Sequence, residues 1–231
     1  MRFGLISEGP TDQATIENML CGIFDDEELY ELITPLQPGG SSDTTQEGGW
    51  ERVLNYISNH KFRQSFSTVE NIVIQIDTDV ATMKGFDVDL RDDEGKTLKE
   101  VASIFEKVKN RLIEQIESGE TGFYEKVKDR IIFAITVHSL EIWLFKHHCK
   151  VTSNKKVINS GENKLATELI KDRKLAQFTT TGKNKTILML KTYDNYDKLS
   201  RKFYDSKTCA QSVDDLCKVD ESFQLFKNQL V

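Results

Sequence analysis

An acidic motif interrupts the first apolar segment of the chain. A short strand-like segment is followed at once by Glu8-Gly9-Pro10-Thr11-Asp12, and residues 13–24 then carry apolar side chains at helical spacing. This change of period predicts that Glu8 lies at the carboxyl end of a buried strand. Thr11 is the expected N-cap of the following helix, and Asp12 falls in its first turn, where an anion is favoured. Open α/β sheets bind their ligands at such strand-to-helix turns.

A second acidic motif ends another apolar segment. Residues 72–76 are apolar apart from Gln75, and Asp77-Thr78-Asp79 follows directly. Side chains two residues apart in a strand point the same way, so both aspartates can face one site.

Apolar strands alternate with amphipathic helices along the first part of the chain. The predicted strands are residues 3–6, 30–34, 70–80 and 131–135. This alternation indicates an α/β fold with a mostly parallel sheet and helices on both faces. Beyond residue 150 the spacing predicts helices at 164–174, 186–195, 196–204 and 212–230, with a loop at 179–185. We therefore expect an α/β core at 1–145 and a basic, mainly helical extension at 146–231, packed on the same domain.

Charge is distributed unevenly along the chain, whose net charge is −6. Residues 1–145 hold 14 Lys and Arg against 27 Asp and Glu, a net −13, whereas residues 146–191 carry a net +8. An acidic half could concentrate divalent cations beside a basic stretch that meets phosphates. The alternative is that both are ordinary solvated surfaces.

The acids of the two motifs are ligands of the kind that hard cations prefer. Glu8, Asp12, Asp77 and Asp79 offer carboxylate oxygens suited to Mg²⁺ or Mn²⁺. If they meet at one end of a sheet, they repel each other unless a cation neutralises them. Two ions about 3.5–4 Å apart could activate a water and stabilise the leaving oxygen of a phosphodiester. The alternative is that the acids only cap a helix and end a strand.

Three segments in this order resemble the Toprim domain of topoisomerases, primases and OLD-type nucleases. They are Glu8-Gly9-Pro10-Thr11-Asp12, Asp77-x-Asp79, and a segment around Glu141 similar to the Phe-Glu-x-Trp-Leu signature of small Toprim proteins. In the third segment Leu140 replaces the Phe. The form of the motifs is most similar to OLD-like nucleases and small Toprim proteins of bacterial defence systems. The resemblance covers residues 1–145.

The resemblance implies a Toprim-like (Rossmann-like) sheet and a Mg²⁺-dependent nuclease with Glu8 and Asp77 as catalytic residues. It implies that Glu8 and Asp12 share metal ions with Asp77 and Asp79. Glu141 would add a third contribution to the metal site, and a salt bridge to a basic residue is the alternative because a buried carboxylate needs a partner.

The same resemblance bears on substrate and partners. It implies DNA, or secondly RNA including tRNA, as the substrate and a role in anti-phage defence beside a separate ATPase. The chain has no Walker motif of its own. A non-catalytic module that binds the ATPase is the alternative function. Topoisomerase- or primase-like strand transfer is less favoured, because no tyrosine nucleophile module or zinc-binding domain is evident.

Nucleases of this kind use a lysine to stabilise the transition state. Lys183 and Lys185, in a Thr- and Gly-containing segment, are the first candidates for that role and for binding nucleic acid, and Lys164 is the second. Ordinary surface lysines are the alternative. His138 could be an acid–base group or a hydrogen-bonded core histidine.

Apolar runs long enough to cross a bilayer are absent from the sequence, and we expect neither a signal peptide nor a membrane partner. The four cysteines are dispersed, which is typical of a reduced, cytoplasmic protein. Homo-oligomerisation is left open.

Overall fold

The computed structural model describes residues 1–36, 49–149 and 159–231. Its centre is a four-stranded parallel sheet with the strand order β2-β1-β3-β4. The strands are β1 (Phe3–Ile6), β2 (Ile33–Pro35), β3 (Asn71–Asp77) and β4 (Ile131–Thr136). The inner strands are almost wholly apolar because helices cover both faces of the sheet. The prediction of an α/β fold with a parallel sheet is thus confirmed.

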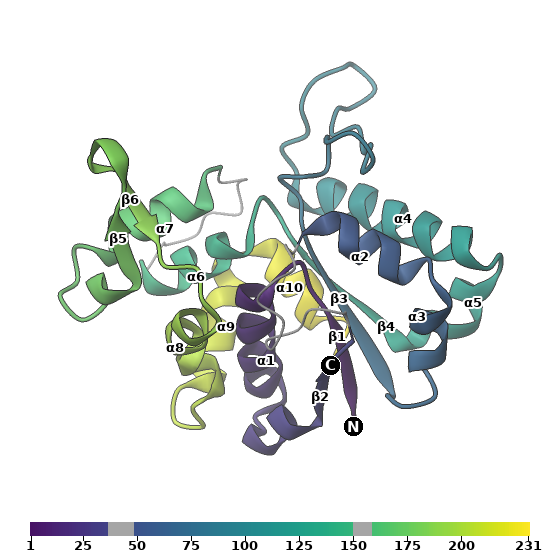
Figure 1. The fold of residues 1–231 in the computed structure, drawn as a ribbon, viewed down its shortest axis with the longest axis horizontal. Helices are drawn as coiled ribbons and strands as arrows, with labels where there is room; N and C mark the ends of the chain where they lie inside the picture. Colours follow the sequence, from purple (N-terminus) through teal and green to yellow (C-terminus); the bar gives the residue numbers. More distant parts are fainter. Residues whose placement is uncertain (37–48, 150–158) are drawn as a thin grey trace.

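Helices from the middle of the chain cover one face of the sheet (Figure 1). They are α2 (Trp50–Ile57), α3 (His60–Ser65), α4 (Val101–Gly119) and α5 (Phe123–Val127). Ile72, Ile74 and Ile76 of β3 point toward this layer, as the period of two in a strand requires. The layer is a continuous apolar core on one side of the sheet.

The other face is covered by helices from both ends of the chain (Figure 1). They are α1 (Pro10–Phe24), α6 (Leu140–His148), α8 (Tyr193–Tyr204), α9 (Cys209–Val219) and α10 (Glu221–Lys227). Helix α8 lies so close to α1 that a Cβ at Gly22 would come within 2.3 Å of the Phe203 carbonyl oxygen. Residues beyond 145 therefore share one core with the amino-terminal half.

A small hairpin stands beside these layers. Helix α7 (Gly161–Leu169) precedes β5 (Thr179–Thr181) and β6 (Ile187–Met189), which pair antiparallel. The short 3-10 helix Lys183–Lys185 joins the two strands. The prediction of a helix at 186–195 is wrong, because Ile187–Met189 pairs with a Thr-rich strand that was expected to be a loop. The region after residue 159 is mainly helical all the same, as expected.

Helix boundaries differ from the prediction at two places that matter for the site. Gly9, rather than Thr11, is the N-cap of α1, because Pro10 occupies the first helical position. Asp12 nevertheless lies in the first turn. The expected helix at 212–230 is divided at Asp220, whose side chain accepts a hydrogen bond from the Phe223 N–H and caps α10.

Three further 3-10 segments complete the described chain: Glu27–Leu32, Lys128–Arg130 and Ala176–Phe178. The first of them takes up most of the predicted strand at 30–34, so β2 begins only at Ile33. None of the helices in the described residues combines the length and apolar character needed to cross a membrane.

Candidate metal centre

The carboxyl ends of β1, β3 and β4 meet at the same edge of the sheet because the strands are parallel. This edge holds five acids, which we call the acidic edge: Glu8, Asp12, Asp77, Asp79 and Glu141. A Glu8 Oε1 atom accepts a hydrogen bond of 2.7 Å from the Asp77 backbone N–H. The Glu8 N–H in turn donates to Oε1 of Gln75 at 3.1 Å. The structure therefore places Glu8 beside Asp77.

Asp77 is held firmly by one of its two oxygens. Its Oδ1 atom accepts hydrogen bonds from Gln75 Nε2 at 2.9 Å and from the Leu140 N–H at 3.1 Å, and also from the Thr136 hydroxyl. In the described part of the chain no donor to Oδ2 is found. Asp77 is thus oriented by β4 and by the first residue of α6.

Asp79 is brought to the same place by the turn after β3. Its N–H donates to the His138 carbonyl at 3.0 Å, while the His138 N–H donates to Oγ1 of Thr78 at 2.7 Å. These two bonds join the segments that follow β3 and β4. Asp79 and His138 consequently line one pocket.

Burial and mutual repulsion change the acidity of this edge. Burial, with the nearby Asp12 as the next cause, raises the pKa of Glu8 to about 8. Burial and the charge of Glu141 raise the pKa of Asp12 to about 7. For the same first reason the pKa of Asp77 lies well above its usual value, and that of Asp79 is also raised. With all five acids ionised, the edge would therefore carry more negative charge than the surrounding protein neutralises, and without a cation it retains protons instead.

A pocket of about 180 Å³ opens beside these carboxylates. Its wall includes Asp77, Asp79, His138, Glu141, Glu162 and Lys191. The start of α7 closes one side, and it approaches α6 closely because residue 161 is glycine. A Cβ at Gly161 would lie 2.8 Å from Oγ of Ser139. Glu8 and Asp12 are not part of the pocket wall.

Glu141 forms the salt bridge that sequence analysis left open as an alternative. Lys191 Nζ lies 3.3 Å from its Oε1 atom, and the Tyr196 hydroxyl donates to the same atom at 2.8 Å. Burial alone would raise the pKa of Glu141, but Lys191 and Tyr196 together lower it. Glu141 also raises the pKa values of Asp12 and Asp77, so it belongs to the acidic edge electrostatically.

Lys191 is the residue of this site that sequence analysis missed. The predicted helix at 186–195 would have placed this lysine in the middle of a helix. Lys191 instead follows β6 and precedes Thr192, whose hydroxyl caps α8 by accepting from the Asn195 N–H. A strand followed by a Thr N-cap was the signal that could have identified this position.

The lysines chosen from the sequence lie elsewhere. Lys183 and Lys185 are exposed at the tip of the β5–β6 hairpin, and neither contributes to the pocket wall. Lys164 is exposed on α7, where its ammonium donates to the Asn159 carbonyl at 2.6 Å. The structure therefore does not bring these three lysines to the acidic edge.

His138 is a half-buried wall residue with an unusual backbone. Its φ angle is 78°, in the left-handed region that is uncommon for residues other than glycine. Nε2 accepts a hydrogen bond from the Ser160 N–H at 3.2 Å, whereas Nδ1 is buried and has no partner among the described residues. The ring therefore faces the pocket with one nitrogen engaged.

The acids of residues 83–94 remain apart from this site. Asp87 and Asp92 accept backbone N–H groups of their own turns, and Asp89 forms an ion pair with Arg91. These contacts are typical of an exposed acidic segment.

The carboxylates of the acidic edge suit a hard divalent cation by their chemistry, but their oxygens do not converge on one common position. Within residues 1–36, 49–149 and 159–231, no three His, Cys, Asp or Glu side chains are arranged to hold a metal ion as they stand. The donors are carboxylate oxygens with raised pKa values, and a cation would offset their mutual repulsion. Glu8, Asp12, Asp77 and Asp79 are the side chains that would hold it.

Comparison with known proteins adds no relative: no family model, curated protein or solved structure matches this chain. The chemistry of the acidic edge and its pocket is therefore the basis on which a function can be argued.

Proposed function

We propose that this chain is a divalent-metal-dependent phosphodiesterase that cleaves nucleic acid at the acidic edge. One observation carries the proposal: Glu8, Asp77 and Asp79, from two neighbouring parallel strands, meet beside an open pocket with too little positive charge to balance them. A structural role alone does not account for this excess charge, because burying uncompensated carboxylates is unfavourable.

Each residue of the site would have a defined task. Glu8, Asp12, Asp77 and Asp79 would hold Mg²⁺ or Mn²⁺, one ion or two. A bound cation of this kind supplies charge for the phosphoryl oxygens and lowers the pKa of a coordinated water. Lys191 would provide positive charge for a phosphate that enters the pocket. His138, in the pocket wall, would be the acid–base group.

Exposed basic residues on α7 and on the β5–β6 hairpin support nucleic acid as the substrate. Lys164 on α7 and Lys183 and Lys185 on the hairpin are exposed. Phosphate groups approaching an acidic edge need such neighbouring cations. DNA is the first candidate substrate and RNA, including tRNA, the second.

A non-catalytic module remains the second candidate function. The observation in its favour is that Glu8 and Asp77 each accept hydrogen bonds from the protein, so both contribute to the structure of the sheet edge. The separate ATPase partner and the role in anti-phage defence stay predictions in either case.

Metal-dependent cleavage of plasmid DNA and total tRNA, assayed side by side, tests the proposal. Glu8→Gln and Asp77→Asn should each lower the cleavage rate at least about a hundredfold, because a metal ligand is lost. Asp93→Asn is the matched control, since it removes an exposed carboxylate in the 83–94 segment. Equal cleavage by all four proteins, or none by the wild type with Mg²⁺ or Mn²⁺, would favour the non-catalytic module.

A further inference from the structure

Lys191 bridges two carboxylates across the pocket. Its Nζ atom lies 3.3 Å from Oε1 of Glu141 and 2.8 Å from Oε2 of Glu162. The Glu141 side chain is 7% exposed, whereas Glu162, at the start of α7, is 36% exposed. One ammonium group therefore has an inner anchor on the acidic edge and an outer anchor on the pocket rim.

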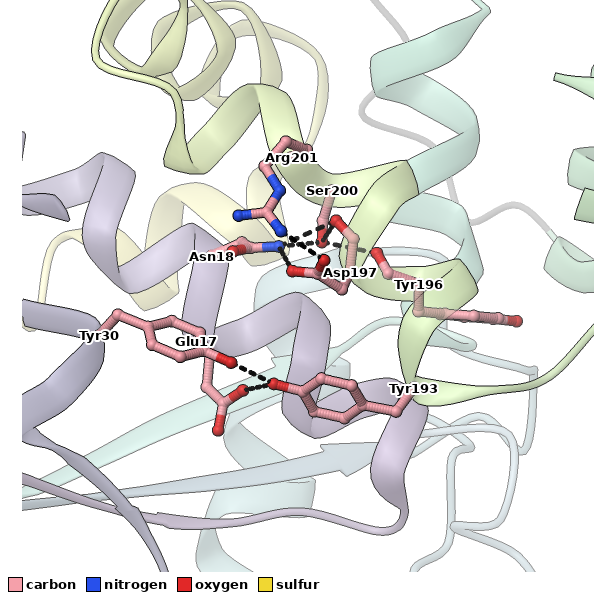
Figure 2. A network of polar contacts seen from close by, with 8 residues as sticks. All are labelled: Glu17, Asn18, Tyr30, Tyr193, Tyr196, Asp197, Ser200 and Arg201. Carbon is pink, nitrogen blue, oxygen red and sulfur yellow. Dashed lines mark hydrogen bonds and ion pairs between the residues drawn. The ribbon is translucent and has the colours of Figure 1, made fainter. Parts of the chain in front are cut away.

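The position of Lys191 is fixed from the C-terminal side by α8. Tyr196 of this helix donates to Glu141. Tyr193, also of α8, donates to Oε2 of the buried Glu17 on α1 at 2.6 Å (Figure 2). The hydroxyl groups of Tyr30 and Tyr193 share a hydrogen bond, and the Asn18 side chain of α1 donates to Asp197 and Ser200 of α8 (Figure 2). The segment that carries Lys191 is consequently held against α1, the helix that carries Asp12.

Lys191 acts on more of the acidic edge than its direct partner. Its charge also lowers the pKa values of Asp12 and Asp79 against the effect of burial. The ammonium group therefore has the electrostatic effect on three acids that a bound cation would have.

We propose that Lys191 is a tethered counter-ion of the acidic edge, and that a divalent cation binds there in exchange for it. The proposal rests on the metal centre of the proposed function and adds a property to it. In the metal-free protein the ammonium group stabilises Glu141. When a cation takes over that charge, Glu162 retains the ammonium at the pocket rim, where it can meet a substrate phosphate.

The proposal predicts an effect opposite to that of losing an ordinary site residue. Removing Lys191 should make metal binding stronger, because the cation no longer displaces a positive charge a few ångströms away. A residue that only orients the substrate would leave metal affinity unchanged, and a residue that supports the fold of the site would weaken it. The direction of the change therefore distinguishes the three roles.

Titration calorimetry of the full-length, metal-free protein with MnCl₂ tests this prediction. Lys191→Met should lower the Kd for Mn²⁺ about tenfold relative to the wild type. Lys185→Met is the matched control: it removes the same charge from the exposed hairpin tip and should change the Kd less than about twofold because of solvent screening. Equal Kd values for wild type and Lys191→Met, or a weaker variant, would overturn the inference while leaving the metal centre in place.

A second pair of variants covers the case in which Lys191→Met does not fold. Glu162→Gln alters only the exposed rim, and it should raise the Kd for Mn²⁺ about threefold because Lys191 then has the acidic edge as its sole anionic anchor within the described pocket. Glu168→Gln, on the same helix, carries the same charge change and should have a smaller effect. Equal effects of the two glutamine variants would contradict the exchange. If neither wild type nor any variant binds Mn²⁺, both this inference and the metal centre of the proposed function fail.

Discussion

Helix α6 connects two buried groups of charged side chains that differ in balance. Near its start lies the acidic edge, where Lys191 is the only cation on the described wall of a pocket that also contains Asp77, Asp79 and Glu141. Near its end, Lys146 forms an ion pair with Asp220 at 2.8 Å, and both side chains are at most 5% exposed. The same helix thus takes part in an unbalanced site and in a balanced one.

In the balanced group, both carboxylate oxygens of Asp220 already have partners within the protein. Asp220 Oδ1 accepts from Trp143 Nε1, Ser222 Oγ and the Phe223 N–H, while Oδ2 accepts from Lys146. The group joins α6 to the junction of α9 and α10. Comparison of the two groups shows that burial of charge is not by itself a sign of function. Excess charge of one sign beside an open pocket is the more informative feature.

The largest effect is expected from breaking the balanced pair. Lys146→Met leaves the Asp220 carboxylate buried without its counter-ion, which should lower the free energy of unfolding by about 3–5 kcal/mol. Urea denaturation measures this loss. Lys218→Met, which removes the exposed partner of Asp215, should change stability by less than about 0.5 kcal/mol. A loss below about 1 kcal/mol for Lys146→Met would show that the pair is not the structural element that the comparison requires.

The next largest effect concerns a buried carboxylate that is balanced by neutral donors. Glu17 is 4% exposed and accepts from Tyr193 and Gln13. Tyr193→Phe removes the hydroxyl that contacts both Glu17 and Tyr30, so the free energy of unfolding should fall by about 1–3 kcal/mol. Tyr204→Phe is the control, because its hydroxyl has no hydrogen-bond partner in the described chain. Equal losses for both variants would show that the hydrogen bonds to Glu17 and Tyr30 are not the cause of the loss.

Most of the sheet was predictable from the sequence, and so was the approach of Glu8 to Asp77. The apolar segments that precede Glu8 and Asp77 are each closed by acidic residues, and the parallel arrangement brings their carboxyl ends to the same edge of the sheet. Lys191 was not predictable in the same way. Its place depends on a three-residue strand, and an apolar run as short as Ile187–Met189 fits a helix equally well. Its ion pair with Glu141 joins residues 50 positions apart, and a local sequence pattern does not predict a contact over that separation.

The free energy of unfolding should depend on pH because of the acidic edge. The folded state holds protons on Glu8 and Asp12 up to about pH 8 and 7, whereas the unfolded chain releases them near pH 4.5 and 3.8. The folded state therefore binds more protons over this interval, and stability present below about pH 4 is lost as the pH rises through 7 to 8. Because both groups are partly exposed and solvent screens their charges, we expect a decrease of about 1 kcal/mol between pH 5 and pH 8.

Urea denaturation in EDTA at several pH values measures this decrease. Glu8→Gln should flatten the pH dependence and raise the stability of the metal-free protein at pH 8, since the repulsion of one carboxylate is removed. Glu221→Gln is a suitable control, because this partly exposed residue at the start of α10 is not one of the acids of the acidic edge. A wild-type stability that rises from pH 5 to pH 8 would contradict the view that the acidic edge is unbalanced.

The smallest effect is expected from replacing exposed lysines that lie neither beside the acidic edge nor in a buried ion pair. Lys183 and Lys185 project from the hairpin tip, where Asn184 and Lys185 have φ angles of 59° and 61°. If these lysines contact phosphates of a nucleic acid bound at the acidic edge, replacing both with Ala should weaken binding only several-fold at moderate salt. The slope of log affinity against log salt should fall by about two units on duplex DNA. Fluorescence anisotropy with labelled DNA and with labelled tRNA at several salt concentrations measures both quantities, and the protein's unfolding free energy should stay unchanged.

Cleavage at saturating substrate should survive in the double variant, because Lys191 rather than the hairpin faces the carboxylates. A collapse of the cleavage rate with intact binding would instead place the transition-state cation on the hairpin, and the contrast between Lys191 and the exposed lysines would have to be abandoned.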